Sequence, residues 1–487
     1  MQILFCTSEA SPFAKTGGLA DVAGSLPEAL HEMGCDVRIF MPLYRCVREM
    51  SFALEPLGKG ATIAIGAHDY HVNLWQRRTP SGIPVYFLEK DEFYDRSFLY
   101  GTPVRGDYED NAERFIAFSL SVRHVCEAAG WFPSIFHLHD WQTGLVAPHF
   151  KTNWRYDPRF ARSATVFTIH NIAYQGVFPA GFFPLLNLPP SEWSFQGIEY
   201  WGQCNFLKAG ITYSDFITTV SPRYAREITT GDFGFGLEGV LKERAKSLSG
   251  ILNGIDTKLW DPRTDRYLPS NYGSYELSGK KTCKAALCKL AGFARDCREF
   301  PLIGMIGRLA AQKGFDLLEK IVPELMKLEV NLVILGTGDA WIEESLRAMQ
   351  SRFADRLKLA DRYDEQMAHL IEAGADIFLM PSRYEPCGLN QMYSLRYGTI
   401  PVVHATGGLD DSVIDVLRHP DSGTGFKFYE YTPRSFLEKI KSALKLFGDR
   451  AKWEEIQRRA MARDFSWAMS AKQYLGVYDK VIAQRRL

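Results

Sequence analysis

Two polar side chains that could take part in group-transfer chemistry, Asp140 and His170, stand at the ends of neighbouring apolar runs. The runs cover residues 134–139 and 164–169. Short, β-rich apolar runs of this kind are typical of buried parallel strands. Because the carboxyl ends of parallel strands meet at one edge of a sheet, where α/β proteins bind ligands, we expect Asp140 and His170 to share one rim.

A second set of charged residues lies in the other half of the chain. Arg308 and Lys313 follow the apolar run 302–307, and Glu385 follows the run 375–380. Arginine can form paired hydrogen bonds with phosphate oxygens, and lysine adds a compact positive charge. These residue types predict an anion site with an acid beside it.

Glycine pairs mark two predicted helix starts. Gly17-Gly18 follows Lys15 and the strand 2–7, and Gly407-Gly408 follows the strand 399–404. Glycine at a helix N-terminus lets a phosphate approach the backbone N–H groups. Together with the charged residues, the pairs predict a diphosphate held between two domains, with the Asp–His rim near the group that the diphosphate carries.

Strands and helices alternate twice along the chain, which predicts an α/β fold class. A strand, a helix over 19–33 and a strand over 35–41 form a βαβ unit, and the alternation begins again near residue 302. We expect two tandem Rossmann-like domains facing a deep cleft. The predicted parts are an N-terminal domain over 1–255, a C-terminal domain over 256–464, and a last helix over 465–487 that packs back on the first domain.

The composition is that of an ordinary globular enzyme. Lys+Arg and Asp+Glu both total 57 of 487 residues, so no net charge favours nucleic acid or an anionic membrane surface. No basic leader and no apolar run of about 18 residues is found, so neither a signal peptide nor a membrane span is expected. Nine cysteines without a CxxC pair indicate reduced thiols in a cytosol. The absence of a transit peptide favours a bacterial cytoplasm, although a processed plastid protein would look the same.

Seven segments together resemble one family, the bacterial glycogen synthases and plant starch synthases. The resemblance runs in order from residue 2 to about 410. It implies a GT-B glycosyltransferase fold and a glucosyltransferase that extends an α-1,4-glucan at its non-reducing end with ADP-glucose, retaining the configuration and releasing ADP. The segments are Lys15-Thr-Gly-Gly-Leu-Ala-Asp-Val22, His139-Asp-Trp141, His170-Asn171, Asn253-Gly254, Arg308-Leu with Lys313-Gly314, Ser382-Arg-Tyr-Glu-Pro-Cys-Gly388 and Thr406-Gly-Gly-Leu409.

The resemblance also implies roles for individual residues. As ADP leaves, Arg308 and Lys313 would neutralise the diphosphate, while Glu385 would hold the glucose hydroxyls. The implied catalytic residues are Lys15, Asp140, His170, Arg308, Lys313 and Glu385. The implied donor-binding residues are Lys15, Gly17, Gly18, Asp21, Asn253, Arg308, Lys313, Tyr363 (on adenine), Glu385, Cys387, Gly388, Leu389, Thr406, Gly407 and Gly408, and the acceptor-binding residues are Tyr100, Asp140, Trp141 and Gln142.

One position departs from the wider pattern of retaining transferases of this fold. Many carry a second Glu eight residues after the first, and here that position is Tyr393. We therefore favour a front-face reaction, in which the leaving phosphate helps to deprotonate the acceptor hydroxyl, over a covalent intermediate. No DxD motif indicates a divalent cation, so we expect neither a metal nor a cofactor.

Two other functions fit the same residues. The first keeps the fold but uses UDP-glucose as donor or a small sugar as acceptor. The second is a glucan-binding or regulatory protein whose catalytic site is inactive. Against the second, all six implied catalytic residues are present together.

Overall fold

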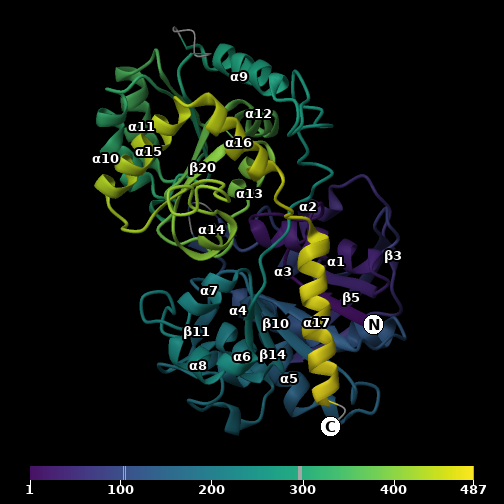
Figure 1. The fold of residues 1–487 in the computed structure, drawn as a ribbon. Helices are drawn as coiled ribbons and strands as arrows, with labels where there is room; N and C mark the ends of the chain where they lie inside the picture. Colours follow the sequence, from purple (N-terminus) through teal and green to yellow (C-terminus); the bar gives the residue numbers. More distant parts are fainter. Residues whose placement is uncertain (103, 105, 294–298, 363, 486–487) are drawn as a thin grey trace. The chain divides into compact units, whose positions relative to one another are not determined.

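In the computed structural model, which describes residues 1–102, 104, 106–293, 299–362 and 364–485, the chain folds as two units. The first unit consists of Met1–Gly254 and Trp467–Leu487, and the second of Ile255–Ser466. Figure 1 shows an α/β sheet with covering helices in each. The predicted boundaries, after residues 255 and 464, lie within two residues of these.

The first unit is built on a sheet of ten described strands in the order β15-β14-β10-β9-β1-β2-β6-β5-β3, with β4 paired to β5. The central strand β1 is buried from Ile3 onward because helices cover both faces, which is why its sequence is continuously apolar. The strands are β1 Gln2–Cys6, β2 Asp36–Pro42, β3 Glu55–Pro56, β4 Ala61–Ile65, β5 His68–Arg78, β6 Pro84–Glu89, β9 Ile135–His139, β10 Ala164–Ile169, β14 Phe216–Thr219 and β15 Leu248–Gly250. Shorter pairs outside it are β7 Gly101–Thr102 with β8 Gly106–Asp107, and β11 Val177–Pro179 and β12 Glu199–Tyr200 with β13 Gln203–Asn205.

Helices of the first unit connect its parallel strands. The helix α1 spans Gly18–Glu32 and ends before Gly34, whose φ of 88° suits the left-handed end of a helix. The others are α2 Arg45–Arg48, α3 Asp91–Tyr94, α4 Asn111–Ala128, α5 Val146–Thr152, α6 Phe206–Tyr213, α7 Pro222–Glu227 and α8 Glu238–Glu243.

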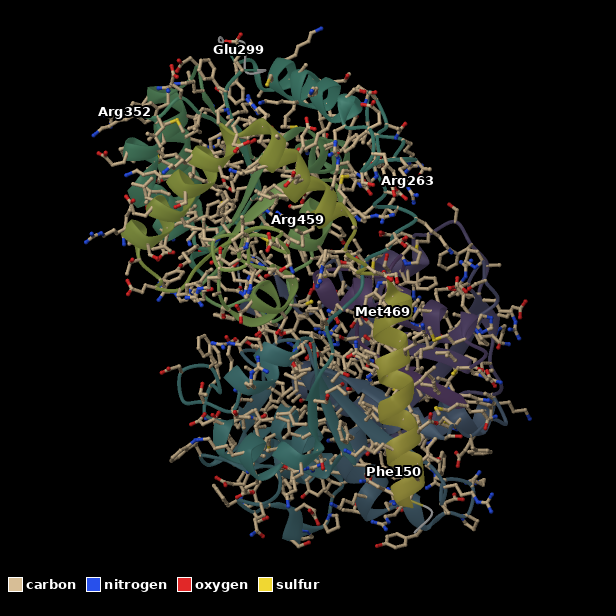
Figure 2. All side chains as sticks on the ribbon, in the orientation of Figure 1. Phe150, Arg263, Glu299, Arg352, Arg459 and Met469 are labelled. Atoms are coloured by element: carbon tan, nitrogen blue, oxygen red, sulfur yellow. The ribbon has the colours of Figure 1, made fainter. Side chains whose placement is uncertain are left out.

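The last helix, α17 (Trp467–Arg485), belongs to the first unit, where it contacts α1 and β10. It is the long yellow helix in Figure 1. Near its end, the guanidinium of Arg485 lies 5.2 Å from the ring centre of Phe150, which Figure 2 labels beside this helix. Tyr478 reaches inward and its hydroxyl is 2.8 Å from Nδ1 of His137.

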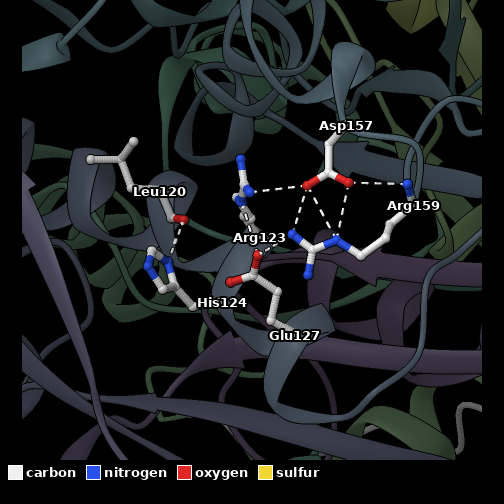
Figure 3. A network of polar contacts seen from close by, with 6 residues as sticks. All are labelled: Leu120, Arg123, His124, Glu127, Asp157 and Arg159. Atoms are coloured by element: carbon white, nitrogen blue, oxygen red, sulfur yellow. Dashed lines mark hydrogen bonds and ion pairs between the residues drawn. The ribbon is translucent and has the colours of Figure 1, made fainter.

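An ion network ties α4 to the segment after α5 (Figure 3). Arg123 contacts both Glu127, at 3.1 Å, and Asp157, at 3.0 Å, and Arg159 contacts the same two carboxylates. Hydrogen bonds from Arg159 lower the pKa of Asp157 to about 2. The network holds the connection between β9 and β10 in place.

The second unit contains a six-stranded parallel sheet in the order β18-β17-β16-β19-β20-β21. Its strands are β16 Leu302–Ile306, β17 Asn331–Leu335, β18 Leu357–Ala360, β19 Ile377–Met380, β20 Ile400–His404 and β21 Phe426–Phe428. Helices α10 and α15 pack together on one face, and α12 packs with α9 and α13 on the other (Figure 1). The helices are α9 Ser278–Ala291, α10 Phe315–Leu325, α11 Ala340–Arg352, α12 Glu365–Gly374, α13 Asn390–Arg396, α14 Gly407–Ser412, α15 Pro433–Phe447 and α16 Arg450–Met461.

Some local expectations were wrong. The apolar segment from Ser249 predicts a strand that ends at Asn253-Gly254, but the strand ends at Gly250, and α9 and α16 were not predicted. The stretch 175–200 is rich in Phe, Pro and Trp, which predicts a long irregular insert, but it contains two short strands and two 3-10 turns. Among the described residues seven cysteines form no disulfide, but Cys288 is disulfide-bonded, so the expectation of reduced thiols fails there.

None of the described helices is long and apolar enough to cross a membrane.

Candidate active site

The strand order reverses once in each sheet. In the first unit β1 lies between β2 and β9, and in the second β16 lies between β17 and β19. In open α/β sheets ligands bind outside the carboxyl ends of the strands at such a reversal. The loops after β1 and β9, and those after β16 and β19, are therefore the candidate site of each unit, and they carry most of the predicted residues.

Asp140 and His170 lie on one rim, as predicted, because β9 and β10 are parallel neighbours. Oδ1 of Asp140 accepts a hydrogen bond from the backbone N–H of His170 at 2.7 Å. The backbone of Asp140 has φ 55° and ψ −178°, a conformation that costs a non-glycine residue about 1–3 kcal/mol. Burial raises the pKa of Asp140 to about 7, although the N–H groups of His170 and Asn171 favour the carboxylate. A strained, partly protonated acid at a sheet rim is a candidate functional group.

His170 is held by a second histidine. Its Nε2 lies 2.9 Å from Nδ1 of His139, the last residue of β9. Burial lowers the pKa of His170 to about 3 and holds the pKa of His139 well below its usual range. Both imidazoles are therefore neutral near pH 7, and His170 can serve as a hydrogen-bonding group but not as a cationic acid.

The loop from Lys15 to Gly18 is exposed and open to a ligand. Lys15 Nζ pairs with Asp21 in the first turn of α1 at 2.6 Å. A Cβ atom added at Gly17 or Gly18 would meet nothing within 4 Å, and Gly17 has an extended backbone that any residue can adopt. The glycines are therefore not needed for the turn, and the free space beside them suits close approach of a phosphate.

Glu9 fixes this loop, and it is not among the residues predicted from the sequence. Its buried carboxylate accepts hydrogen bonds from the N–H and the hydroxyl of Thr16 at 2.5 and 2.6 Å, from the N–H of Gly17 at 3.3 Å and from the hydroxyl of Tyr100 at 2.6 Å. Among the described residues no cation pairs with Glu9. The N–H of Gly17 is thus engaged internally, which leaves Gly18 as the better candidate donor to a diphosphate. The only sequence signal for Glu9 is an acid directly after β1.

A cavity of about 520 Å³ opens beside this loop. Lys15 and Thr16 line it on one side, and residues 97–102 line it on the other. Tyr100, a predicted acceptor-binding residue, is among them and is joined to the loop through Glu9.

The other predicted acceptor-binding residues are less accessible. Trp141 is 8% exposed, and its ring packs against Phe115 and Phe178. Gln142 is 6% exposed, and its Oε1 has no hydrogen-bond partner among the described residues. The ring of Trp141 is therefore a packing group behind the rim, whereas Oε1 of Gln142 is an acceptor that a ligand could use.

In the second unit Lys313 and Glu385 form an ion pair at the strand-order reversal. Lys313 Nζ is 2.6 Å from Oε2 of Glu385, which also accepts a hydrogen bond from Ser382 at 3.0 Å. Arg308 is exposed, and its one hydrogen bond among the described residues is to Gln312 at 3.3 Å. The carboxylate balances Lys313, and the guanidinium of Arg308 keeps an uncompensated positive charge.

The Gly407-Gly408 pair has a packing reason. A Cβ atom at Gly407 would lie 2.0 Å from the carbonyl oxygen of Glu385, and one at Gly408 would lie 2.1 Å from that of Cys387. The N–H of Gly408 donates to the carbonyl oxygen of Glu385 at 3.1 Å. The N–H of Gly408 is therefore engaged within this region and the pair lets two loops approach each other, while its phosphate contact stays a prediction.

The same loop contains Gly388, whose φ of 70° requires glycine before α13. It is followed by Leu389, which caps α13, and preceded by the buried Cys387. Thr406, also buried, is the residue before α14. These four stay predicted donor-binding residues whose backbone lies beside Glu385.

Asn253 follows β15 in the first unit and is 6% exposed, and its Oδ1 has no partner among the described residues. Tyr363, predicted to stack on adenine, lies outside the described residues. The ring of Tyr393, at the position of the absent second Glu, stacks on Trp260 with 3.9 Å between ring centres. Trp260 in turn stacks on His369 at 3.8 Å, so this position is used for packing.

The chain is similar to known proteins over its whole length. Residues 2–243 match the family described as starch synthase catalytic domain, and residues 298–460 match glycosyl transferases group 1. The glycogen synthase of Koribacter versatilis is 44% identical over 489 residues, covering 99% of this chain and 98% of the relative. That of Anaeromyxobacter sp. is 47% identical over 484 residues, covering 99% and 100%.

Solved structures are also similar to the chain over almost its whole length. The catalytic domain of starch synthase IV from Arabidopsis thaliana, bound to ADP and acarbose, is 32% identical with a TM-score of 0.91 and covers 99% of both chains. The sucrose-phosphate synthase of Thermosynechococcus elongatus, 17% identical with a TM-score of 0.60 and 99% coverage of both chains, bears on the fold alone.

Proposed function

The chain belongs to the family of glycogen and starch synthases, with their GT-B fold, and on this premise we propose that it transfers glucose from ADP-glucose to an α-1,4-glucan. The bond between the glucose C1 and the β-phosphate oxygen breaks, and C1 bonds to the 4-hydroxyl oxygen at the non-reducing end of the glucan. The hydroxyl proton passes to a phosphate oxygen of the leaving ADP. The configuration at C1 is retained.

The observation that carries the proposal is the charge arrangement at the reversal point of the second unit. Arg308 has no carboxylate partner among the described residues, whereas Lys313 is already paired with Glu385. An uncompensated guanidinium can take up the negative charge that develops on the diphosphate as the C1–O bond breaks. Lys313 stays in place through Glu385, whose remaining acceptor capacity suits the hydroxyls of a sugar.

In the first unit the groups near the sugar are neutral or only partly charged. His170 is a neutral imidazole at the rim, suited to hydrogen bonding with the glucose. Asp140 is anchored through its Oδ1, so its other oxygen can accept a hydrogen bond from the acceptor hydroxyl. Lys15 and Gly18 lie at the N-terminus of α1 and suit the donor diphosphate.

The position of Tyr393 supports a front-face reaction. Its ring is stacked in an aromatic column with Trp260, and it supplies no carboxylate that could attack C1. The leaving phosphate is then the base that receives the acceptor proton. We further propose that the reaction needs neither metal nor cofactor and takes place in a bacterial cytoplasm; the bacterial origin of the relatives supports the second point.

The test is ADP release from ADP-glucose, measured with and without glycogen in EDTA, with UDP-glucose as parallel donor. Glycogen-dependent release from ADP-glucose in EDTA is the expected result. Faster release from UDP-glucose would refute the donor assignment. Absence of release from both donors, with glycogen still bound, would refute the transferase and leave a glucan-binding protein.

A further inference from the structure

A buried histidine lies directly beneath His170 and is not part of the proposed reaction. We propose that His139 is a positioning residue that holds His170 in the tautomer with its proton on Nδ1. The inference deepens the proposed function, on which its catalytic consequence rests. The tautomer itself is a property of the free protein.

The contact between the two rings permits two arrangements. His139 Nδ1 and His170 Nε2 are 2.9 Å apart, so one of these nitrogens donates a proton and the other accepts it. Because both imidazoles are neutral, each ring carries a single N–H group. The choice of donor therefore fixes both tautomers.

The other nitrogen of His139 decides between them. Its Nε2 is buried and has no hydrogen-bond partner among the described residues. If His170 donated, the proton of His139 would have to be on Nε2 and would be a buried, unsatisfied N–H. Such donors are rarer and more costly in proteins than an unused acceptor. His139 therefore donates from Nδ1, and the proton of His170 is on its own Nδ1.

The ring of His139 cannot easily turn away from this contact. It stacks on Phe5 with 4.0 Å between ring centres and lies 4.1 Å from the ring of His137. His137 is itself held from both sides, by the hydroxyl of Tyr478 at 2.8 Å and by that of Thr168 at 2.7 Å. A packed column thus runs from the last helix to the rim of the sheet and keeps the donor of His139 aimed at His170.

The consequence is that His170 presents a donor and not an acceptor at its outer nitrogen. Among the described residues no hydrogen bond involves His170 Nδ1. An N–H at this position suits an oxygen of the bound sugar, and a neutral donor does so without repelling the positive charge that develops at C1. Losing one such hydrogen bond lowers turnover about tenfold.

The test uses the full chain with ¹⁵N-labelled histidine, since ring-nitrogen chemical shifts distinguish protonated from unprotonated nitrogens. The His170→Asn variant identifies the signals of His170 by their loss. Without donor or glucan, we expect a protonated Nδ1 and an unprotonated Nε2 in His170. A protonated Nε2 would overturn the proposal, whatever the transferase assay gives.

Two substitutions of His139 then separate positioning from packing. His139→Asn places an amide donor near the position of Nδ1, and should keep the His170 tautomer and a kcat within about threefold of the wild type. His139→Leu has no donor, so the two tautomers of His170 should mix and kcat should fall about tenfold. An unchanged His170 tautomer in folded His139→Leu would refute the inference. If His139→Leu does not fold, the wild-type and Asn spectra still decide.

Tyr478→Phe is the matched control. It removes an equally buried hydrogen bond from the same column, but the bond is to His137 and not to His170. We expect a lower unfolding free energy with the His170 nitrogen shifts unchanged. If Tyr478→Phe moved the shifts as much as His139→Leu, general loosening of the column would explain both, and the specific role of His139 would be refuted.

Discussion

Replacing Glu9 tests how the loop after β1 is held. The carboxylate accepts four hydrogen bonds from neutral groups, two backbone N–H groups on one oxygen and two hydroxyls on the other. In Glu9→Gln the amide oxygen can keep the two N–H groups, while the NH₂ group donates to the hydroxyls of Thr16 and Tyr100. Tyr100 can then donate to Ser8, which lies 2.8 Å away. The glutamine variant should therefore keep the loop geometry, whereas Glu9→Ala removes every acceptor.

The magnitudes follow from the donors involved. Hydrogen bonds to a charged group contribute about 1.5–3 kcal/mol each and neutral ones about 1 kcal/mol, so weakening four of them would by itself lower the unfolding free energy of Glu9→Gln by about 2–8 kcal/mol. Because a neutral amide costs less to bury than a carboxylate, most of this loss is recovered, and we expect a net loss of about 1 kcal/mol. Thr16 and Gly17 are exposed, and water can replace part of what Glu9→Ala loses. We expect a loss of about 2 kcal/mol for that variant, measured by urea unfolding.

The effect on the donor substrate differs in sign between the two variants. Glu9→Gln removes a negative charge beside the proposed diphosphate site, so the KM for ADP-glucose should stay the same or fall. Glu9→Ala releases the loop that carries Lys15, and the KM should rise about tenfold. Initial rates at saturating glycogen measure both. Glu55→Gln, an exposed charge change in β3, is the control and should change neither quantity. A folded Glu9→Ala protein with wild-type KM and kcat would refute the idea that Glu9 positions the loop.

Three further predictions concern other parts of the two rims. Because burial raises the pKa of Asp140 to about 7, above its ordinary 3.8, the native state binds this proton more tightly than the unfolded chain, so stability falls as the pH rises between these values. The unfolding free energy of Asp140→Asn, measured with urea, should thus be higher than that of the wild type at about pH 8, and this difference should disappear at about pH 4. Lys313→Ala leaves Glu385 buried without its cation, so the unfolding free energy should fall by about 2 kcal/mol and kcat by at least about 100-fold. Adding Glu385→Gln should restore part of the stability but no activity. A double-mutant cycle measures both effects. Gly408→Ala places a Cβ 2.1 Å from a carbonyl oxygen and should reduce the soluble, folded yield, whereas Gly18→Ala should unfold like the wild type and raise only the KM for ADP-glucose.

The sequence was informative wherever a residue directly followed an apolar strand. Asp140 and His170 were placed on one rim because parallel strands have a fixed direction, and the structure confirms that proximity. The same reasoning placed Lys313 and Glu385 after two strands of the second half; the structure shows that these strands are neighbours and that the two residues form an ion pair. Such predictions depend only on where the strands end and on their parallel direction, which the short apolar runs and the helices between them indicate.

What the sequence could not supply depends on contacts between distant segments. Glu9 can hold the loop because Thr16 and Tyr100 turn their donors toward it, and no local pattern encodes that convergence. The Gly407-Gly408 pair was predicted from its resemblance to a phosphate loop, and the structure adds a second reason for these glycines, because another loop passes within contact distance. A glycine motif alone does not show whether its glycines make room for a ligand or for a neighbouring segment of the backbone.

The charges at the carboxyl ends of the strands differ between the two units, and this difference bears on the proposed reaction. In the first unit Lys15 is paired with Asp21, Glu9 is satisfied by neutral donors and His170 is uncharged. In the second unit Arg308 is left without a carboxylate. In the proposed reaction, the charge that appears on the departing diphosphate would therefore be balanced chiefly by residues of the second unit, while those of the first unit would orient the sugar through neutral hydrogen bonds. A neutral environment around the glucose also suits a front-face reaction, because a fixed cation near C1 would oppose the positive charge that develops there.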